Sequence, residues 1–144
     1  MGSVPVSPTW KHKEKLEPTD CMRLLASAHL GRVGLCTPTG PQILPVNHTV
    51  LDGAIVFRTD LYSVIAEGTH EADVAFEADE LDDRMQSGWS VLVTGRAEHV
   101  EDPAHVAEIF RRMGEPWAPG LRPMVVRIQP ALITGRRFDR DSAS

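Results

Sequence analysis

Residues 32–58 read "RVGLCTPTGPQILPVNHTVLDGAIVFR", and this stretch decides the fold class. It contains three apolar runs, which are separated by two short groups of turn-forming residues. The runs cover Arg32–Thr37, Gln42–Val50 and Ala54–Arg58, and the turns cover Pro38–Pro41 and Leu51–Gly53. Turns of this length join neighbouring antiparallel strands. The stretch therefore predicts an antiparallel meander of three strands.

The third run leads through a polar turn into a short helix. Residues 55–67 read "IVFRTDLYSVIAE", so Arg58 and Thr59 lie where a buried strand gives way to a helix start. A guanidinium, a hydroxyl and the backbone N–H groups of a helix N-terminus can together bind a phosphate. The alternative is a plain strand end, with a solvated arginine and a threonine that caps the helix. The residues leave both interpretations open.

More elements are predicted on both sides of this stretch. A helix capped by Thr19 or Asp20 is expected to begin near Pro18 and to stop at Gly31. The elements predicted after the meander are a short helix at Leu61–Glu67, a strand at Asp73–Ala78, a polar loop at Glu80–Ser87, a strand at Gly88–Val100, a helix from Asp102 to Gly114 and a strand at Pro123–Phe138.

Two of these strands carry further information. Gly88–Val100 alternates apolar with polar residues, but Leu92 makes its second face apolar in part. Because such a face is hard to leave to solvent, we expect it to pack against a second copy of the chain in a two-fold contact. Pro130 in the last strand predicts a bulge or an edge position, since proline lacks the N–H that a strand ladder uses.

Together the elements predict a mainly β fold, a closed or split antiparallel barrel, because closure removes exposed strand edges. Residues 1–15 are rich in Pro, Ser and Lys, and are expected to form an N-terminal tail that docks in part through Trp10. Residues 16–140 are expected to form the barrel domain.

The composition excludes several classes of function. The chain has 144 residues, is 42% hydrophobic and carries a formal net charge of −5, so we expect one globular domain. Without a basic stripe it is not expected to bind nucleic acid, and without a run of about 18 apolar residues it is not expected to span a membrane. There is no signal-peptide core, and Cys21 and Cys36 lack metal-type spacing. We therefore expect a cytoplasmic protein with two reduced thiols in apolar surroundings.

Four segments resemble one family in their order and spacing. They are "HLGRVGLCTPTGPQILPVNHTVLDGAIVFRTD", "VAFEADELDD", "GWSVLVTGRAEHVEDP" and "ITGRRF". The chain is similar to the pyridoxamine 5′-phosphate oxidase-like proteins, and most of all to the short actinobacterial-type branch that includes nitroimidazole-resistance relatives. The resemblance covers about residues 18–138. It implies a six- to seven-stranded split β-barrel homodimer with flavin mononucleotide (FMN) in two clefts between the subunits, and an oxidoreductase acting on a small molecule.

The resemblance also implies which residues contact the flavin. The residues carried over are Arg58, Thr59 and Ser63 for the phosphate, Pro45, Val46 and Asn47 for the isoalloxazine ring, and Trp89 and Ser90, supplied by the second subunit, for the other side of the ring. No catalytic residue is carried over, because hydride transfer belongs to the flavin and the protein supplies placement and electrostatics.

The turn after Arg58 departs from the family pattern. Val64 stands where the family usually carries a lysine, and Tyr62 stands where it carries a small residue. Losing one charge-assisted hydrogen bond to the phosphate costs about 1.5–3 kcal/mol. Three possibilities therefore stay open: FMN bound through Arg58, another cofactor such as a deazaflavin or haem, and a barrel that has lost its flavin and serves as a non-catalytic binding protein.

The remaining candidates have structural alternatives. His48 is expected to be structural more often than catalytic, and Trp89 fits core packing as well as a ring contact. The acidic residues from Asp79 to Asp83 fit a solvated loop better than a metal site. Arg136 and Arg137 either reach an anion or are solvated after the last strand.

Overall fold

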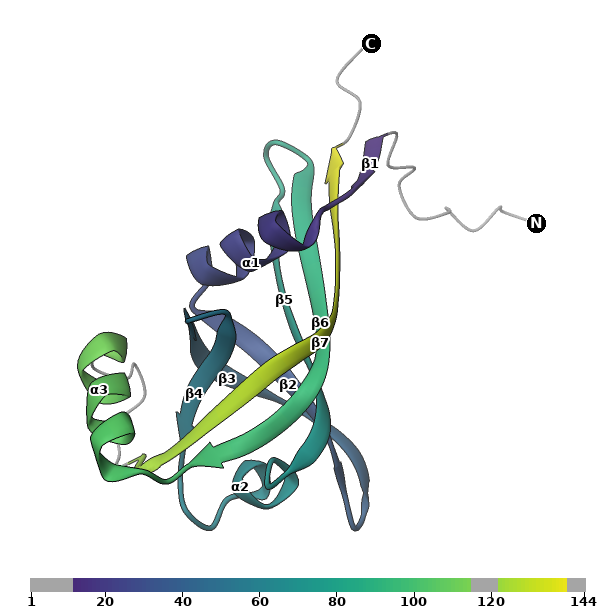
Figure 1. Cartoon of the computed structure of the whole chain (residues 1–144). Coiled ribbons are helices and arrows are strands. Elements are labelled where there is room, and N and C mark those ends of the chain that lie inside the picture. Colours follow the sequence, from purple (N-terminus) through teal and green to yellow (C-terminus); the bar gives the residue numbers. More distant parts are fainter. Residues whose placement is uncertain (1–11, 115–121, 140–144) are drawn as a thin grey trace.

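The predicted meander is present, and it forms half of a closed barrel. The computed structural model describes residues 12–114 and 122–139. Its strands are β1 (His12–Lys15), β2 (Leu30–Thr37), β3 (Gly40–Leu51), β4 (Ala54–Thr59), β5 (Ala72–Asp82), β6 (Ser87–Val100) and β7 (Met124–Asp139). They form one antiparallel sheet in the order β1-β7-β4-β3-β2-β5-β6, and β6 pairs again with β7. Strands β2 to β7 therefore close a barrel, which confirms the predicted mainly β, split-barrel fold (Figure 1).

Strand β7 closes the barrel because it pairs with β4 through its first residues and with β6 along most of its length. The register shifts on the way, since Gly95 pairs with Pro130 whereas Thr94 pairs with Leu132. A Cβ atom at Gly95 would lie 2.2 Å from the carbonyl oxygen of Gln129, so no larger residue fits beside the bulge. This confirms the irregularity predicted from Pro130.

Three helices in the described residues cover the barrel, namely α1 (Pro18–Ser27), α2 (Val64–Gly68) and α3 (Pro103–Met113). Helix α1 lies across one end, α2 lies at the other end, and α3 lies against the outside near β4 (Figure 1). The main hydrophobic cluster fills the barrel and reaches α1 through Cys21 and Leu25. A smaller cluster joins Val56, Val125 and Ile109 beneath α3. None of the described helices is long and apolar enough to cross a membrane.

Helix α3 begins where the sequence predicts. The Asp102 side chain accepts a hydrogen bond from the backbone N–H of His105 at 3.0 Å, and Pro103 occupies the first turn, where its missing N–H costs nothing. Its apolar stripe packs on the barrel, and Phe110 is part of that stripe. The packing fixes the position of Phe110 relative to β4.

Several boundaries differ from the prediction. Helix α1 ends at Ser27, and Gly31 instead belongs to β2, where an added Cβ atom would lie 2.2 Å from the ring of Phe76. Close packing, not helix termination, is therefore the reason for this glycine. The polar loop expected at residues 80–87 is too long, because β5 continues to Asp82 and β6 starts at Ser87. A hairpin that extends beyond the core tolerates polar residues on both faces.

The N-terminal region differs as well. Residues 12–15 form β1 and pair with the end of β7, so this strand falls inside the predicted tail. The predicted docking of Trp10 lies outside the described residues. Cys21 is buried as expected, but Cys36 is exposed, because alternation along β2 turns it away from the barrel interior.

Candidate functional site

Strands β3 and β4 part at one place in the barrel. They pair with each other only from His48 to Leu51, whereas β3 pairs with β2 from Gly40 and β4 pairs with β7 as far as Thr59. Past the pair formed by His48 and Phe57, the facing edges of β3 and β4 are therefore not joined to each other. We call this place the β3–β4 split.

The split lies between two of the segments that the sequence singles out. If the β3–β4 pairing continued past His48 and Phe57, Asn47 would face Arg58 and Val46 would face Thr59. Pro45 is exposed, Asn47 is half-buried and Val46 is buried. The His48 N–H bonds to His29, so the backbone groups of Val46, two residues away, also face β2. The Asn47 N–H and C=O and the Pro45 carbonyl face the split instead, where they can hydrogen-bond a ligand.

Arg58 points toward α3. It shares a face of β4 with Val56, which belongs to the cluster beneath α3. Its Nε donates a hydrogen bond of 2.9 Å to the carbonyl oxygen of Arg122, and its guanidinium carbon lies 3.8 Å from the centre of the Phe110 ring. No ion pair joins Arg58 to a carboxylate of residues 12–114 or 122–139. The guanidinium is thus held through Nε and the Phe110 ring, and no hydrogen bond joins its terminal N–H groups to residues 12–114 or 122–139.

Thr59 and Ser63 point away from Arg58 and contact each other. Thr59 is 3% exposed, and its hydroxyl oxygen lies 2.9 Å from that of Ser63. The Ser63 oxygen also accepts a hydrogen bond from the Ala66 N–H at 3.0 Å. Ser63, and not Thr59, is therefore the residue that caps α2. The structure does not bring the three predicted phosphate contacts together, because successive residues of a strand face opposite sides.

The two residues that depart from the family pattern both face solvent. Val64 is 43% exposed at the start of α2, and Tyr62 is 96% exposed in the turn before it. Tyr62 therefore does not cover the β3–β4 split within a single chain.

Trp89 and Ser90 also lie on opposite faces, here of β6. Trp89 is 8% exposed and belongs to the main hydrophobic cluster together with Leu16 and Cys21. Ser90 is half-buried on the outer face, where it pairs across the strands with Asp79 and Arg136. Core packing thus accounts for Trp89, and Ser90 is the member of the pair that faces outward.

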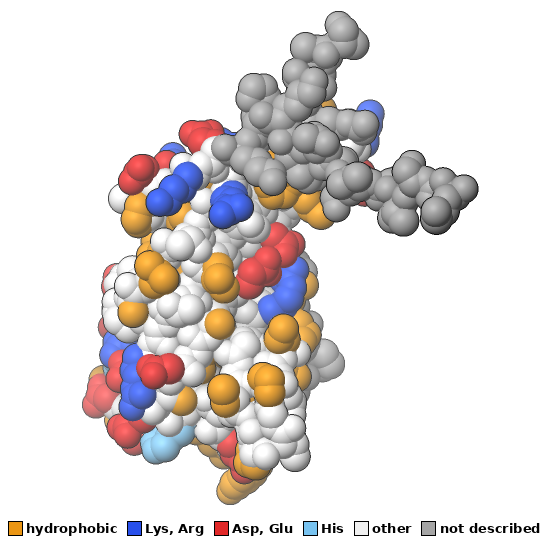
Figure 2. Space-filling model, turned by 90° about the vertical axis from the view of Figure 1, so that its right-hand side faces the viewer, with side chains coloured by type: hydrophobic (Ala, Val, Ile, Leu, Met, Phe, Trp, Pro, Cys, Tyr) orange, Lys and Arg blue, Asp and Glu red, His pale blue; other side chains and the backbone are white. Residues whose placement is uncertain are grey.

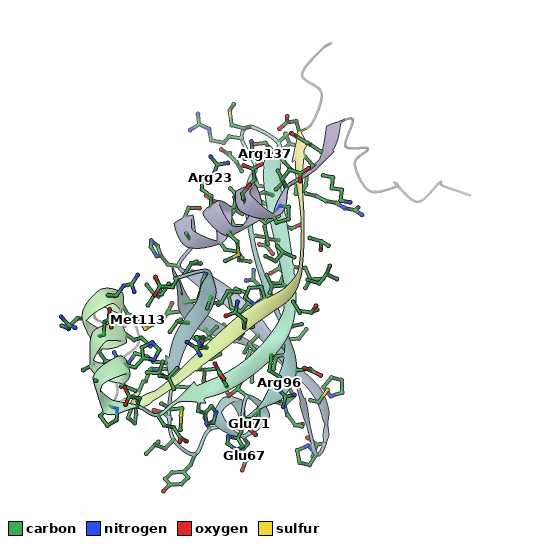
Figure 3. The ribbon with its side chains drawn as sticks, viewed as in Figure 1. Arg23, Glu67, Glu71, Arg96, Met113 and Arg137 are labelled. Carbon is green, nitrogen blue, oxygen red and sulfur yellow. The ribbon has the colours of Figure 1, made fainter. Side chains whose placement is uncertain are left out.

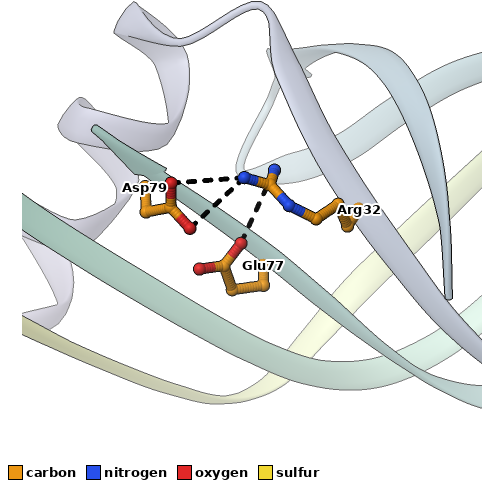
Figure 4. A network of polar contacts seen from close by, with 3 residues as sticks. All are labelled: Arg32, Glu77 and Asp79. Atoms are coloured by element: carbon orange, nitrogen blue, oxygen red, sulfur yellow. Dashed lines mark hydrogen bonds and ion pairs between the residues drawn. The ribbon is translucent and has the colours of Figure 1, made fainter. Parts of the chain in front are cut away.

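An ionic cluster on the same outer face was not predicted. The Arg32 guanidinium lies 3.2 Å from an oxygen of Asp79 and 3.7 Å from Oε1 of Glu77 (Figure 4). Burial raises the pKa of Glu77 to about 7, with a further contribution from Asp79, while Arg32 opposes the rise. The charges were visible in the sequence, but only the pairing of Arg32 with Glu77 across β2 and β5 brings them together.

Exposed apolar side chains surround this cluster. Leu30, Ile43, Leu92 and Leu132 are between 46% and 74% exposed, and strand alternation places them on the outer face of β2, β3, β6 and β7. Figure 2 looks onto this side of the barrel and shows hydrophobic side chains around neighbouring acidic and basic groups. We call this region the outer sheet face.

The other candidates have structural positions. The buried His48 places Nε2 2.9 Å from the carbonyl oxygen of Leu25 and packs its ring against Phe76. Burial lowers the pKa of His48 and so favours the neutral ring. Arg137 pairs with Glu14 of β1, at the end of the molecule opposite α2 (Figure 3). No group of three His, Cys, Asp or Glu residues that could hold a metal ion is present in the described part of the chain.

A closed antiparallel barrel with one parted strand pair defines a split β-barrel protein. More specifically, the chain belongs to the pyridoxamine 5′-phosphate oxidase family, because the family model of that description matches residues 17–137. This confirms the resemblance drawn from the sequence.

Individual relatives narrow the comparison. An uncharacterised protein of Mycobacterium tuberculosis is 44% identical over 133 residues, which cover 89% of this chain and 87% of that protein. The structure of a FAD-binding protein from Mycobacterium smegmatis is 36% identical, with a TM-score of 0.74, and the match covers 87% of this chain and 98% of that one. A FAD- and haem-binding protein from the same species is 13% identical, with a TM-score of 0.69 and coverage of 90% and 76%, a likeness in fold alone.

Proposed function

We propose that this protein binds a flavin nucleotide, FMN, at the β3–β4 split and acts as a flavin-dependent oxidoreductase on a small molecule. The observation that carries the proposal is the split itself, which sets a free strand edge at Pro45 and Asn47 beside the strand end that carries Arg58. The FAD-binding relative from Mycobacterium smegmatis, at 36% identity over most of both chains, supports a flavin as the ligand class.

The residues at the split fit such a ligand. At the split, Asn47 offers a backbone N–H and C=O, and Pro45 a C=O, to the nitrogen and oxygen atoms along a flavin ring. Arg58 offers terminal N–H groups to a phosphate, because among the described residues it donates a hydrogen bond through Nε alone, to the Arg122 carbonyl. When bound, the flavin would supply hydride transfer, and this chain's residues would hold and orient it.

We further propose that the protein works as a homodimer. The outer sheet face exposes Leu30, Ile43, Leu92 and Leu132, a set of large apolar side chains that a second copy could cover in a two-fold contact. Ser90 lies on this face, so one subunit could bring it to the flavin of the other.

Two alternatives follow from specific observations. The exposed Val64 leaves the α2 turn without a cation, which favours a barrel that has lost its flavin and acts as a binding protein. The FAD- and haem-binding protein shares the fold, which keeps haem as another cofactor, and a deazaflavin would use the same strand edge.

The absorbance spectrum of the freshly purified protein tests the proposal. We expect the bands of an oxidised flavin, or quenching of flavin fluorescence when FMN is added to the colourless protein. No binding at about 100 μM FMN would reject the proposal, since this corresponds to less than about 5.5 kcal/mol of binding free energy. A haem band would instead support the second alternative.

A further inference from the structure

The Arg32–Glu77–Asp79 cluster carries one more negative than positive charge when all three groups are ionised. Nη2 of Arg32 donates hydrogen bonds to both carboxylate oxygens of Asp79, at 3.2 and 3.3 Å, but Nη1 lies 3.7 Å from Oε1 of Glu77. This Oε1 is buried, and no hydrogen bond reaches it from the part of the chain that the structure describes. A buried carboxylate oxygen without a donor is costly, and protonation of the carboxyl group reduces that cost. The geometry therefore favours a neutral Glu77 beside an Arg32–Asp79 ion pair.

The strands next to β5 bring no second cation to Glu77 within the described residues. The residue that pairs with Glu77 is Arg32 on β2 and the uncharged Leu92 on β6. Beyond Arg32, β3 places a proline, and beyond β6, β7 brings Arg136, which lies level with Asp79 and not with Glu77. The other ion pairs on this face of β5, β6 and β7 are Asp73 with Arg96 and Glu98 with Arg127.

Exposed apolar side chains lie on either side of the strand that carries Glu77. Leu92 on β6 is 46% exposed and Leu30 on β2 is 52% exposed. If a second copy covers these side chains, water leaves the cluster too, and an ionised Glu77 loses its hydration. The Arg32–Asp79 pair carries both signs, so about a two-fold axis it is complementary to its own copy. An extra charge on Glu77 would instead meet the same charge on the second copy.

We propose that Glu77 makes association through the outer sheet face depend on protons: two copies associate while Glu77 is neutral, and the contact weakens when Glu77 ionises. The inference rests on the homodimer of the proposed function and deepens it. Because the dimer then binds protons more tightly than the monomer, association is stronger at lower pH. The pKa of Glu77, raised by burial to about 7, places the change near neutral pH.

The test measures the dimer dissociation constant of the full chain by sedimentation velocity over a concentration series at pH 6 and pH 8.5. Glu77→Gln imitates the neutral carboxyl group at both pH values. Asp79→Asn removes the neighbouring carboxylate and releases Arg32 for Glu77. Glu80→Gln is the matched control, because Glu80 is an exposed carboxylate of the same strand that alternation turns to the opposite face. Thermal unfolding at both pH values confirms that each variant folds.

We expect the dissociation constant of the wild type to be about tenfold lower at pH 6 than at pH 8.5, because the dimer contains two copies of Glu77 and each contributes about threefold. Glu77→Gln should bind as tightly at pH 8.5 as at pH 6, whereas Glu80→Gln should behave as the wild type does. Histidines that titrate in this range remain in Glu77→Gln, so an effect of theirs would persist in that variant. In Asp79→Asn the dimer should weaken at a lower pH, because Arg32 then stabilises the ionised Glu77.

The outcomes separate the inference from the proposal on which it rests. If the wild type is a dimer with the same dissociation constant at both pH values, or if Glu77→Gln keeps the pH dependence, the inference is wrong and the homodimer stands. If Glu77→Gln does not fold, an Asp79→Asn variant with the pH dependence of the wild type rejects the inference. If the wild type is a monomer at both pH values, the homodimer and the inference are both wrong.

Discussion

At the scale of single residues, the end of β4 shows how strand alternation separates neighbours. Arg58 faces α3 and contacts Phe110, whereas Thr59 faces the other side and contacts Ser63. The sequence shows the two residues together and suggests one phosphate site. The structure assigns the helix cap to Ser63 and leaves Arg58 for a different contact.

A pair of substitutions distinguishes the two sides of β4. We predict that Val64→Lys changes FMN affinity by less than about twofold, because Val64 lies at the exposed start of α2, on the side of the Thr59–Ser63 pair. Arg58→Ala should weaken FMN binding about tenfold to a hundredfold and leave riboflavin binding unchanged. Isothermal titration calorimetry with FMN and with riboflavin measures these affinities. Tighter FMN binding by the Val64→Lys variant would place the phosphate at the α2 turn instead.

Because His48 is buried, we predict that the folded chain loses stability in acid. Burial lowers the pKa of His48 in the folded chain, while an unfolded histidine titrates near about 6.5. The unfolded state therefore binds more protons below this pH, so the free energy of unfolding should fall as the pH drops from 6.5 toward the lowered pKa. Urea unfolding at pH 7.5 and 5.5 tests this. The His48→Gln variant should lose less stability between the two pH values, and an equal loss would contradict the assignment.

At the scale of helices and strands, local patterns predicted most of the fold. Alternation identified β6, turn residues delimited β2, β3 and β4, and Asp102 with Pro103 marked the start of α3. These signals are local, so a single sequence carries them. The β3–β4 split could not be predicted in this way, because it depends on where strand pairing stops.

The candidate site was predicted less completely than the fold, for the same reason. The contacts of Arg58 with Phe110 and Arg122 join residues more than 50 positions apart, and the pairing of Arg32 with Glu77 depends on the register of β2 and β5. The family resemblance named Pro45, Val46 and Asn47, which do lie at the split, although their contact with a flavin stays a prediction.

For Glu77 we predict that stability changes with pH in the opposite direction to the change caused by His48. Burial raises the pKa of Glu77 to about 7, whereas an unfolded glutamate titrates near about 4.3. The folded state therefore holds the proton more tightly, so stability should fall as the pH rises from 4.3 to 7. Glu77→Gln removes this charge. We therefore compare the urea midpoint of the variant with that of the wild type, and expect the variant to gain more at pH 8 than at pH 5. If the difference between the two midpoints is the same at both pH values, ionisation of Glu77 does not cause the change in stability.

At the scale of the whole molecule, the outer sheet face combines exposed leucines with the Arg32–Glu77–Asp79 cluster. Leu92 is 46% exposed beside Glu77, at the centre of this face. We predict that Leu92→Glu converts a dimer into a monomer, because it places a second carboxylate next to Glu77 in the contact. Analytical ultracentrifugation at micromolar concentration measures the mass. Met85→Glu is the control, since Met85 is 70% exposed at the tip of the β5–β6 hairpin. A monomeric wild type would contradict the proposed homodimer.

The most direct test of the central claim is a crystal structure of the protein grown with FMN. We predict isoalloxazine density along the free edge of β3 at Pro45 and Asn47, with the phosphate beside Arg58. We also predict a second copy on the outer sheet face. Flavin density elsewhere on the barrel would contradict the account. So would a β3–β4 split without flavin in crystals grown at saturating FMN.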